Sequence, residues 1–167
     1  HGVPDFGTGR PMLDDFDRAL LNELQRDDSR TADQLAAVVP LSSSAIARRL
    51  RRLRADKVIR ATIALLASKF TDRRLRALVF IVLAEHADRR GKAALEQRLN
   101  DEPSVQFCYD VTGSIDMVAL FDCANMAEFT TITDRVLLPD PTVRRYDAHF
   151  VRREVKFAPF VELRSEP

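Results

Sequence analysis

The chain has 167 residues and little of what marks disulfide, metal or redox chemistry. Its two cysteines, Cys108 and Cys123, are too few for a disulfide framework or a metal-ligand cluster, so we expect buried thiols in strands of a protein from a reducing compartment. With five glycines and three histidines, the sequence shows no phosphate-binding glycine loop, no Ser/His/Asp relay and no pair of catalytic carboxylates. We therefore expect no metal, no cofactor and no enzymatic activity.

Long apolar runs and excess charge are absent as well. No apolar run reaches the roughly 18 residues of a membrane span and no secretory signal is visible, so we expect a soluble, cytoplasmic protein without a membrane partner. The formal net charge is +1, which argues against general binding of polyanions. Positive charge is instead local: residues 42–60 read SSSAIARRLRRLRADKVIR, with five arginines between positions 48 and 54.

Residues 42–60 have the pattern of a helix that lies in DNA. At about 100° per residue, Ile46, Leu50 and Leu53 share one side, which would face a core. Guanidinium groups and a serine hydroxyl point to the other side, where they suit phosphate oxygens and guanine edges. The alternative is a solvated cationic face, but only Asp56 offers a counter-charge in this stretch. The candidate DNA-binding residues are Ser42, Ser43, Ser44, Arg48, Arg49, Arg51, Arg52 and Arg54.

The residues before this helix favour a helix-turn-helix. Apolar residues recur at helical spacing from Asp14 to Arg26, and three aspartates stand near the start, where the helix dipole favours anions. Residues 31–34, TADQ, have the form of a capping box that opens a second helix, which Pro40 ends. Ser42 would cap the third helix after a short turn. The β-branched residues over 58–63 suit a strand or wing beside the bundle.

The second half of the chain alternates strands and helices. Turn and cap signals separate its apolar runs, with Gly113–Ser114 as a two-residue hairpin connection and Asn125 as a helix cap. The order is βαββαβ, a ferredoxin-like sandwich with two helices on one sheet face. The expected elements are a strand over 75–84, a helix over 91–100, strands over 105–112 and 115–122, a helix over 125–137 and an extended stretch over 142–155.

These patterns predict an α+β protein with an N-terminal winged helix-turn-helix domain and a C-terminal βαββαβ sandwich. Because apolar residues occupy both faces of the first strand, a second copy would cover the sheet face that the helices leave open, which predicts a homodimer. Residues 1–11 are rich in Gly and Pro and lack periodicity. The expected divisions are a flexible arm or expression remnant over 1–12, a DNA-binding domain over 13–65, a linker over 66–74, a sandwich domain over 75–160 and a tail over 161–167.

Two short motifs stand in the second half of the chain. Val111–Asp116 reads VTGSID, a V-T-G-x-x-D pattern between the second and third strands, and Arg153–Lys156 reads REVK. They follow an acidic first helix, a helix-turn-helix and a Val58–Ile59 step after the third helix. In this order, over about residues 13–157, the chain resembles the Lrp/AsnC (feast/famine) transcriptional regulators.

This resemblance implies a transcriptional regulator that binds double-stranded DNA at a pseudo-palindromic operator. In the family, RAM-type C-terminal domains dimerise through their sheets, assemble into tetramers or octamers and bind small effectors, commonly amino acids, near the G-x-x-D turn. Gly113 would let backbone N–H groups approach a carboxylate and Asp116 would pair with an α-ammonium, although a purely structural turn also explains both residues. The candidate effector-binding residues are Thr112, Gly113, Ser114, Ile115, Asp116, Tyr146 and Ala148.

One departure from the family bears on the effector. Many members carry V-R-R-T-x-T at the start of the last strand, whereas residues 143–148 read VRRYDA here. Tyr146 therefore replaces a small side chain and Ala148 replaces a hydroxyl. If these residues face the effector, Tyr146 narrows the pocket or offers a phenol; alternatively it packs at an interface.

Two other functions remain open at this stage. The sirohaem decarboxylases share the two-domain layout but are enzymes that use histidine and arginine around a tetrapyrrole, and this chain offers His86 and His149. A satisfied or exposed imidazole is the commoner state of such histidines. The other possibility is a ligand-sensing protein that does not bind DNA, in which case the arginine side chains of residues 48–54 would have no binding partner.

Overall fold

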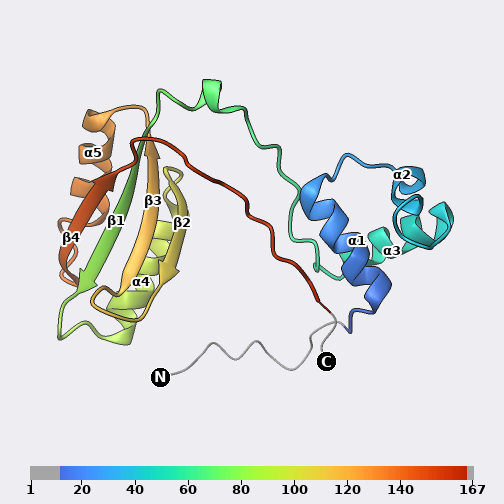
Figure 1. Ribbon diagram of the computed structural model, residues 1–167. Coiled ribbons are helices and arrows are strands. Elements are labelled where there is room, and N and C mark those ends of the chain that lie inside the picture. The colour runs from blue at the N-terminus through green and yellow to red at the C-terminus, as the bar shows by residue number, and fades with distance from the viewer. Residues whose placement is uncertain (1–11, 165–167) are drawn as a thin grey trace. The chain divides into compact units, whose positions relative to one another are not determined.

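The computed structural model describes residues 12–164, so all of the arm expected over residues 1–12 except Met12 lies outside the described residues. The chain divides into two compact units (Figure 1). The helical unit contains the residues up to Leu65 and also those from Phe157 onward, whereas the sheet unit contains Leu66–Lys156. The chain therefore passes between the units twice, and the end of the expected sandwich domain together with the described part of the expected tail belongs to the helical unit.

Three helices build the helical unit: α1 (Asp15–Arg26), α2 (Ala32–Ala36) and α3 (Ser43–Ala55). The capping box at the start of α2 is present, because the Thr31 hydroxyl accepts from the Gln34 N–H and the Gln34 side chain accepts from the Thr31 N–H. Ser42 caps α3, as expected. The apolar stripes meet in one core, formed by Leu20, Leu21, Leu24, Leu35, Val39, Ile46, Leu50 and Leu53.

The segment after α3 differs from the expectation. No strand forms over residues 58–63 in the described part of the chain; Val58 and Ile59 pack half-buried against the helical core, and residues 60–67 are exposed. A β-branched run becomes a strand only beside a hydrogen-bonded neighbour, and none lies beside this run. Lys57 ends the helix in the left-handed region with φ 58°.

The sheet unit confirms the ferredoxin-like order. After a short 3₁₀ turn (Ser68–Phe70), four antiparallel strands pair in the order β2-β3-β1-β4, and both helices lie on one face of this sheet (Figure 1). The elements are β1 (Leu75–Leu83), α4 (Arg89–Asp101), β2 (Val105–Asp110), β3 (Met117–Cys123), α5 (Met126–Val136) and β4 (Val143–Phe150).

The connection between β2 and β3 is longer than expected. β2 ends at Asp110 and β3 begins at Met117, so residues 111–116 form the connection instead of a two-residue hairpin at Gly113–Ser114. The Val111 N–H still donates to the Asp116 carbonyl at 2.8 Å, which closes the loop. The prediction of a two-residue hairpin was wrong because it took Gly113 as the only turn signal. The residues on both sides of Gly113 and Ser114 also leave the pairing of β2 with β3.

The helix-covered sheet face forms the core of this unit. Alternate strand residues such as Val79, Ala119 and Phe121 are buried there against Leu95 and Leu99 of α4. The cysteines lie in strands, Cys123 buried in β3 and Cys108 half-buried in β2. Burial raises the pKa of both thiols, so neither is activated as a nucleophile.

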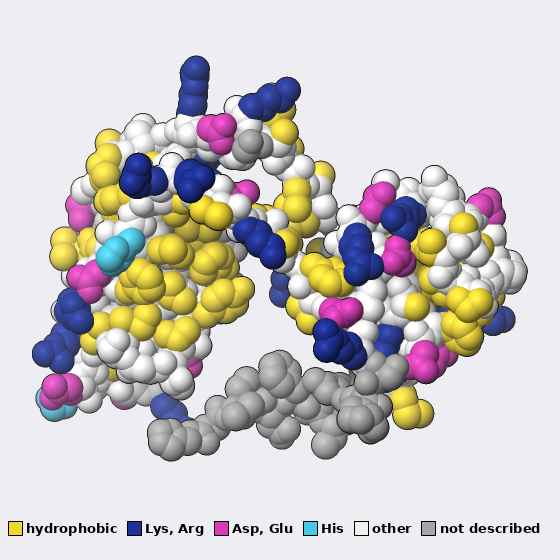
Figure 2. Space-filling view, viewed as in Figure 1, with side chains coloured by type: hydrophobic (Ala, Val, Ile, Leu, Met, Phe, Trp, Pro, Cys, Tyr) yellow, Lys and Arg dark blue, Asp and Glu magenta, His cyan; other side chains and the backbone are white. Residues whose placement is uncertain are grey.

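The opposite sheet face, which we call the open face, is apolar as well. The strand residues that alternate with the buried ones point away from the helices and are half-buried or exposed. Figure 2 shows hydrophobic side chains as one patch over this face of the sheet. They are Leu78, Phe80, Val82, Phe107, Tyr109, Val118 and Leu120. No helix among residues 12–164 is long and apolar enough to cross a membrane.

Candidate DNA interface and effector site

The core anchors α3 from behind and leaves one side of it exposed. Ile46, Leu50 and Leu53 are buried, as the stripe predicts. Arg48 and Arg51 are exposed on the other side and have no ion pair or hydrogen bond with any of the described residues. Both guanidinium groups are therefore available to a phosphate or a base edge.

Two serines at the start of α3 hold the helix in place. The Ser42 hydroxyl accepts from the Ala45 N–H at 3.3 Å, and the Ser43 hydroxyl donates to the Asp33 carboxylate on α2. The Ser44 hydroxyl is exposed and lies 3.2 Å from that of Ser42. Ser42 and Ser44 are both exposed, and of these two Ser44 is the one whose hydroxyl does not cap the helix.

Arg49 and Arg52 contact α1, which the sequence pattern did not predict. Arg49 Nη1 lies 2.8 Å from Asp17 Oδ1 and 2.6 Å from Asp14 Oδ2, and Arg52 Nη2 bonds the other Asp17 oxygen. The Asp17 carboxylate is only 1% exposed, so its charge needs these partners. Hydrogen bonds to Asp14 and then Asp17 raise the pKa of Arg49. We call these four residues the α1–α3 brace.

The brace gives several candidates a partner within the helical unit. Arg49 and Arg52 pair with Asp14 and Asp17, and Arg54 lies 3.3 Å from Asp28, so contact of these three arginines with DNA stays a prediction. The counter-charges come from another helix, so counting acids within α3 missed them. The aspartates at the start of α1 were attributed to the helix dipole, and nothing in the local pattern indicated their long-range partners.

The Val111–Asp116 turn is held by its last residue. Asp116 Oδ2 accepts from the Leu83 N–H at 2.8 Å, and the Asp116 N–H donates to the Ile81 carbonyl at 3.0 Å. Leu83 lies beyond Ile81 and Met117, the last register pair between β1 and β3, so the Asp116 carboxylate supplies an acceptor where that ladder has ended. Asp116 therefore serves the structure of the turn, and its half-buried carboxylate has a second oxygen for other contacts.

The middle of this turn is open. Gly113 has φ +142°, and a Cβ built on it would meet nothing within 4 Å. Thr112 and Ser114 are exposed, and Ile115 is half-buried. The backbone here can be approached closely, as a bound carboxylate would require, although the positive φ alone accounts for the glycine.

Lys92 of α4 adds a cation that sequence reasoning missed. Its Nζ lies 2.8 Å from Asp110 Oδ1, at the end of β2, and 4.0 Å from Glu96 Oε1. The hydrogen bond to Asp110 is the main cause that raises the pKa of Lys92, and the charge of Asp116 adds to it. A groove of about 750 Å³ between α4 and β2 is lined by both Asp110 and Glu96.

The other two effector candidates face the core. Tyr146 and Met117 are both register partners of Ile81, so Tyr146 lies at the same end of the sheet as the turn, with β1 between β4 and β3. Tyr146 and Ala148 are half-buried and pack against the core cluster under the helices. Tyr146 thus packs beside β1 against the core of its own unit, and its contact with an effector or an interface stays a prediction.

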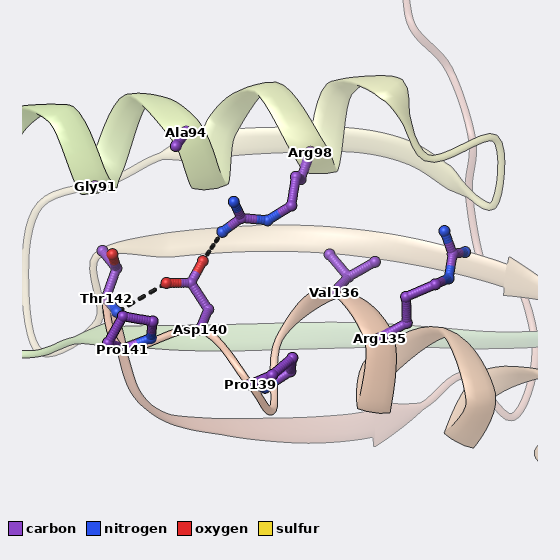
Figure 3. Close-up of a pocket in the computed structure, with 9 residues that line it drawn as sticks. All are labelled: Gly91, Ala94, Arg98, Arg135, Val136, Pro139, Asp140, Pro141 and Thr142. Atoms are coloured by element: carbon purple, nitrogen blue, oxygen red, sulfur yellow. Dashed lines mark hydrogen bonds and ion pairs between the residues drawn. The ribbon is translucent and has the colours of Figure 1, made fainter.

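A second cavity lies between α4 and the segment that joins α5 to β4 (Figure 3). It measures about 430 Å³, and the Arg98 side chain reaches across it to Asp140. Asp140 also accepts from the Thr142 N–H at 2.8 Å, and Arg135 lies 2.6 Å from the buried Glu102. Both arginines are thus committed to buried carboxylates, so the cavity lining is mainly structural.

The comparisons with known proteins identify the family. The model of the AsnC-type helix-turn-helix domain matches residues 13–54, and that of the Lrp/AsnC ligand binding domain matches residues 76–159. The chain is 31% identical over 156 residues to the leucine-responsive regulatory protein of Haemophilus influenzae, and the alignment covers 91% of each chain. The chain belongs to the Lrp/AsnC family of transcriptional regulators.

Solved structures with the same fold extend over most of the chain. A transcriptional regulator from Neisseria meningitidis in complex with L-Met is 25% identical, with a TM-score of 0.78 over 90% of this chain and 96% of that one. A feast or famine regulatory protein from Mycobacterium tuberculosis complexed with L-methionine is 26% identical, with a TM-score of 0.77 over 91% and 100%. The helix-turn-helix and ligand-binding domain make DNA and a small molecule the two partner classes.

Proposed function

We propose that this protein binds a specific operator through Ser44, Arg48 and Arg51. The observation that carries the proposal is that both arginines are exposed and have no partner among residues 12–164, on a helix whose other side is fixed by the core and the α1–α3 brace. Ser44 and Arg48 lie toward the start of α3, where recognition helices read bases, and Arg51 lies further along, where it suits a phosphate. Regulation of transcription then follows from operator occupancy and needs no catalysis.

Dimerisation through the open face would supply two such helices. Its apolar side chains, among them Phe80 and Leu120, have no cover from the described residues, and burying apolar area stabilises association by about 25 cal/mol per Å². A twofold dimer binds a pseudo-palindromic site, and further pairing of dimers would give the tetramers or octamers expected from the family.

The dimer has its own test. Leu120→Glu places a charge in the middle of the open face and should give a monomer in sedimentation at micromolar concentration. Leu138→Glu is the matched control, because Leu138 is an exposed leucine outside the strands. A dimer that survives Leu120→Glu as well as Leu138→Glu would place the interface elsewhere.

The effector we propose is an amino acid or a closely related metabolite, bound at the Val111–Asp116 turn. Exposed backbone around Gly113 and the cation of Lys92 suit a carboxylate, and the carboxylates of Asp110 and Asp116 suit an ammonium group. The two L-methionine complexes of similar proteins support this ligand class. Ligand binding would change DNA binding only if the effector binds two assembly states with different affinity.

The enzyme alternative has less support from the geometry. His86 is exposed after the end of β1, whereas His149 is the register partner of Leu78 and packs edge-on against Phe80 at 5.1 Å. His86 therefore lies beyond the end of β1, whereas His149 lies beside the middle of that strand. Mixing the protein with sirohaem and following absorbance over time tests this alternative, and conversion of the pigment would favour the enzyme.

One experiment tests the proposed function as a whole. Fragments of the source genome are selected on the purified protein, with and without a panel of amino acids, and sequenced. We expect a small set of related pseudo-palindromic sites whose recovery changes with at least one amino acid. Recovery of unrelated fragments in proportion to their length would show charge-driven binding only and would contradict the proposal.

A further inference from the structure

The C-terminal segment of the chain returns to the helical unit and lies along α1. Residues 157–164 follow β4 and the connecting residues 151–156, have no regular secondary structure and form part of the helical unit (Figure 1). Leu163 is half-buried and packs against the core of that unit. This segment lies outside the helix-turn-helix and outside the Val111–Asp116 turn, and both family matches end before residue 160.

Two side-chain amides of α1 hold the backbone of this segment. Asn22 Nδ2 donates to the Leu163 carbonyl at 3.0 Å, and its Oδ1 accepts from the Leu163 N–H at 2.9 Å. Gln25 repeats the arrangement with Val161, with both bonds at 2.9 Å. Each primary amide thus satisfies the donor and the acceptor of one residue, as a neighbouring strand would.

The spacing of these pairs requires an extended occupant. Asn22 and Gln25 stand three residues apart and share one face of the helix, whereas Val161 and Leu163 stand two apart and share one edge of an extended chain. A helical or sharply turned segment would not present the N–H and the carbonyl of both residues to the two side-chain amides. Side chains add to the contact, because the Arg26 guanidinium lies 4.7 Å from the centre of the Phe160 ring.

We propose that this face of α1 is a docking site for an extended peptide, and that its occupant is the chain's own segment 157–164, which ties the helical unit to the sheet unit by a second tether. The first passage, residues 60–67, is exposed and makes no strand, so by itself it leaves the helical unit free to rotate. A docked C-terminal segment closes the chain into a loop through both units and removes much of this freedom.

Docking is tested by hydrogen exchange in the full chain. The variant combines Asn22→Ala and Gln25→Ala, which remove both amides and keep α1 helical, since alanine is the best helix former. The Val161 and Leu163 amides should be protected in the parent and exchange about 10-fold faster or more in the variant, while amides of α3 keep their protection. Arg18→Gln is the control, because Arg18 is on the same helix and pairs with Asp15.

The tether is tested by backbone ¹⁵N relaxation of the same proteins. With the segment docked, the helical unit should show the longer rotational correlation time of a restrained body, and the double variant should shorten it without changing the sheet unit. Arg18→Gln should match the parent. Val161 and Leu163 amides that exchange at unfolded-chain rates in the parent would overturn the docking site, and equal correlation times in parent and double variant would overturn the tether. Neither readout involves DNA or an effector, so both stand apart from the proposed function.

Discussion

At the scale of single residues, the arginines of α3 divide by what they contact. Arg48 and Arg51 are exposed and unpaired among the described residues, whereas Arg52 bonds the buried Asp17. The periodicity of α3 predicts which arginines leave the core, but it places Arg52 beside Arg48 on the outward side. Only the fold brings an acid of α1, 35 residues away in sequence, to its guanidinium.

This division predicts different defects for two alanine variants. Arg48→Ala should weaken binding to the preferred operator by about 1 to 3 kcal/mol and relax its sequence preference, with folding unchanged. Arg52→Ala should instead lower the free energy of unfolding of the helical unit by about 1 to 2 kcal/mol, because Arg49 remains on Asp17 and Arg52 is half exposed. Gel-shift titrations over operator variants and thermal melting separate the two. Equal stability of Arg52→Ala and the parent would contradict the brace.

The brace also predicts a response to acid. Burial raises the pKa of Asp14, but its bonds to the Asp17 N–H and to Arg49 outweigh this effect, so the pKa lies below its ordinary 3.8. A carboxylate with a lowered pKa contributes stability that is present above pH about 4 and is lost as pH falls through the folded-state pKa. The helical unit should therefore lose stability below about pH 4.

Asp14→Asn tests this source of the pH dependence. Asparagine still caps α1 but carries no charge for Arg49, so the variant should be less stable near pH 6 and lose less stability on acidification. Melting curves of the helical unit, followed by its NMR signals from pH 6 to pH 3, measure both effects. Parallel curves for parent and variant would assign the acid response to other groups.

At the scale of elements, the sequence predicts the helices more accurately than the turn between β2 and β3. The stripe of Ile46, Leu50 and Leu53 and the caps at Thr31 and Ser42 depend on neighbours in the chain, and all are present. The strand expected over 58–63 would need a partner strand, and the spacing of residues in the sequence does not show whether such a partner is present. The length of the Val111–Asp116 turn depends on the bond from Asp116 to β1, again a contact between distant residues.

That bond sharpens the test of the effector site. Asp116→Ala would leave the Leu83 N–H without its acceptor, so a lost response could reflect a damaged turn. Asp116→Asn keeps an oxygen acceptor and removes the charge, so we expect an intact fold and an amino-acid affinity at least about 10-fold weaker by calorimetry. Asp134→Asn on the exposed side of α5 is the control. Unchanged affinity in Asp116→Asn would leave the turn a purely structural feature.

At the scale of the whole molecule, two segments of chain connect the helical unit to the sheet unit. The stiffness of these connections should determine how DNA affinity depends on the spacing between the operator half-sites. A dimer presents two recognition helices to half-sites separated by whole turns of about 10 bp. Inserting about 5 bp places the second half-site on the opposite side of the duplex. If residues 157–164 stay docked on Asn22 and Gln25, the helical units cannot follow this rotation, and the insertion should cost the parent most of its specific affinity.

The Asn22→Ala and Gln25→Ala double variant should tolerate the insertion better. Released from the second tether, each helical unit is held only by the exposed residues 60–67, which can absorb part of the rotation. We expect the penalty for the half-turn insertion to fall by about 10-fold relative to the parent, while binding to the original spacing weakens slightly because the freed units must be ordered again. Fluorescence titrations with a spacing series measure both, with Arg18→Gln as control. If parent and double variant pay the same penalty at every spacing, the C-terminal segment does not set the orientation of the recognition helices.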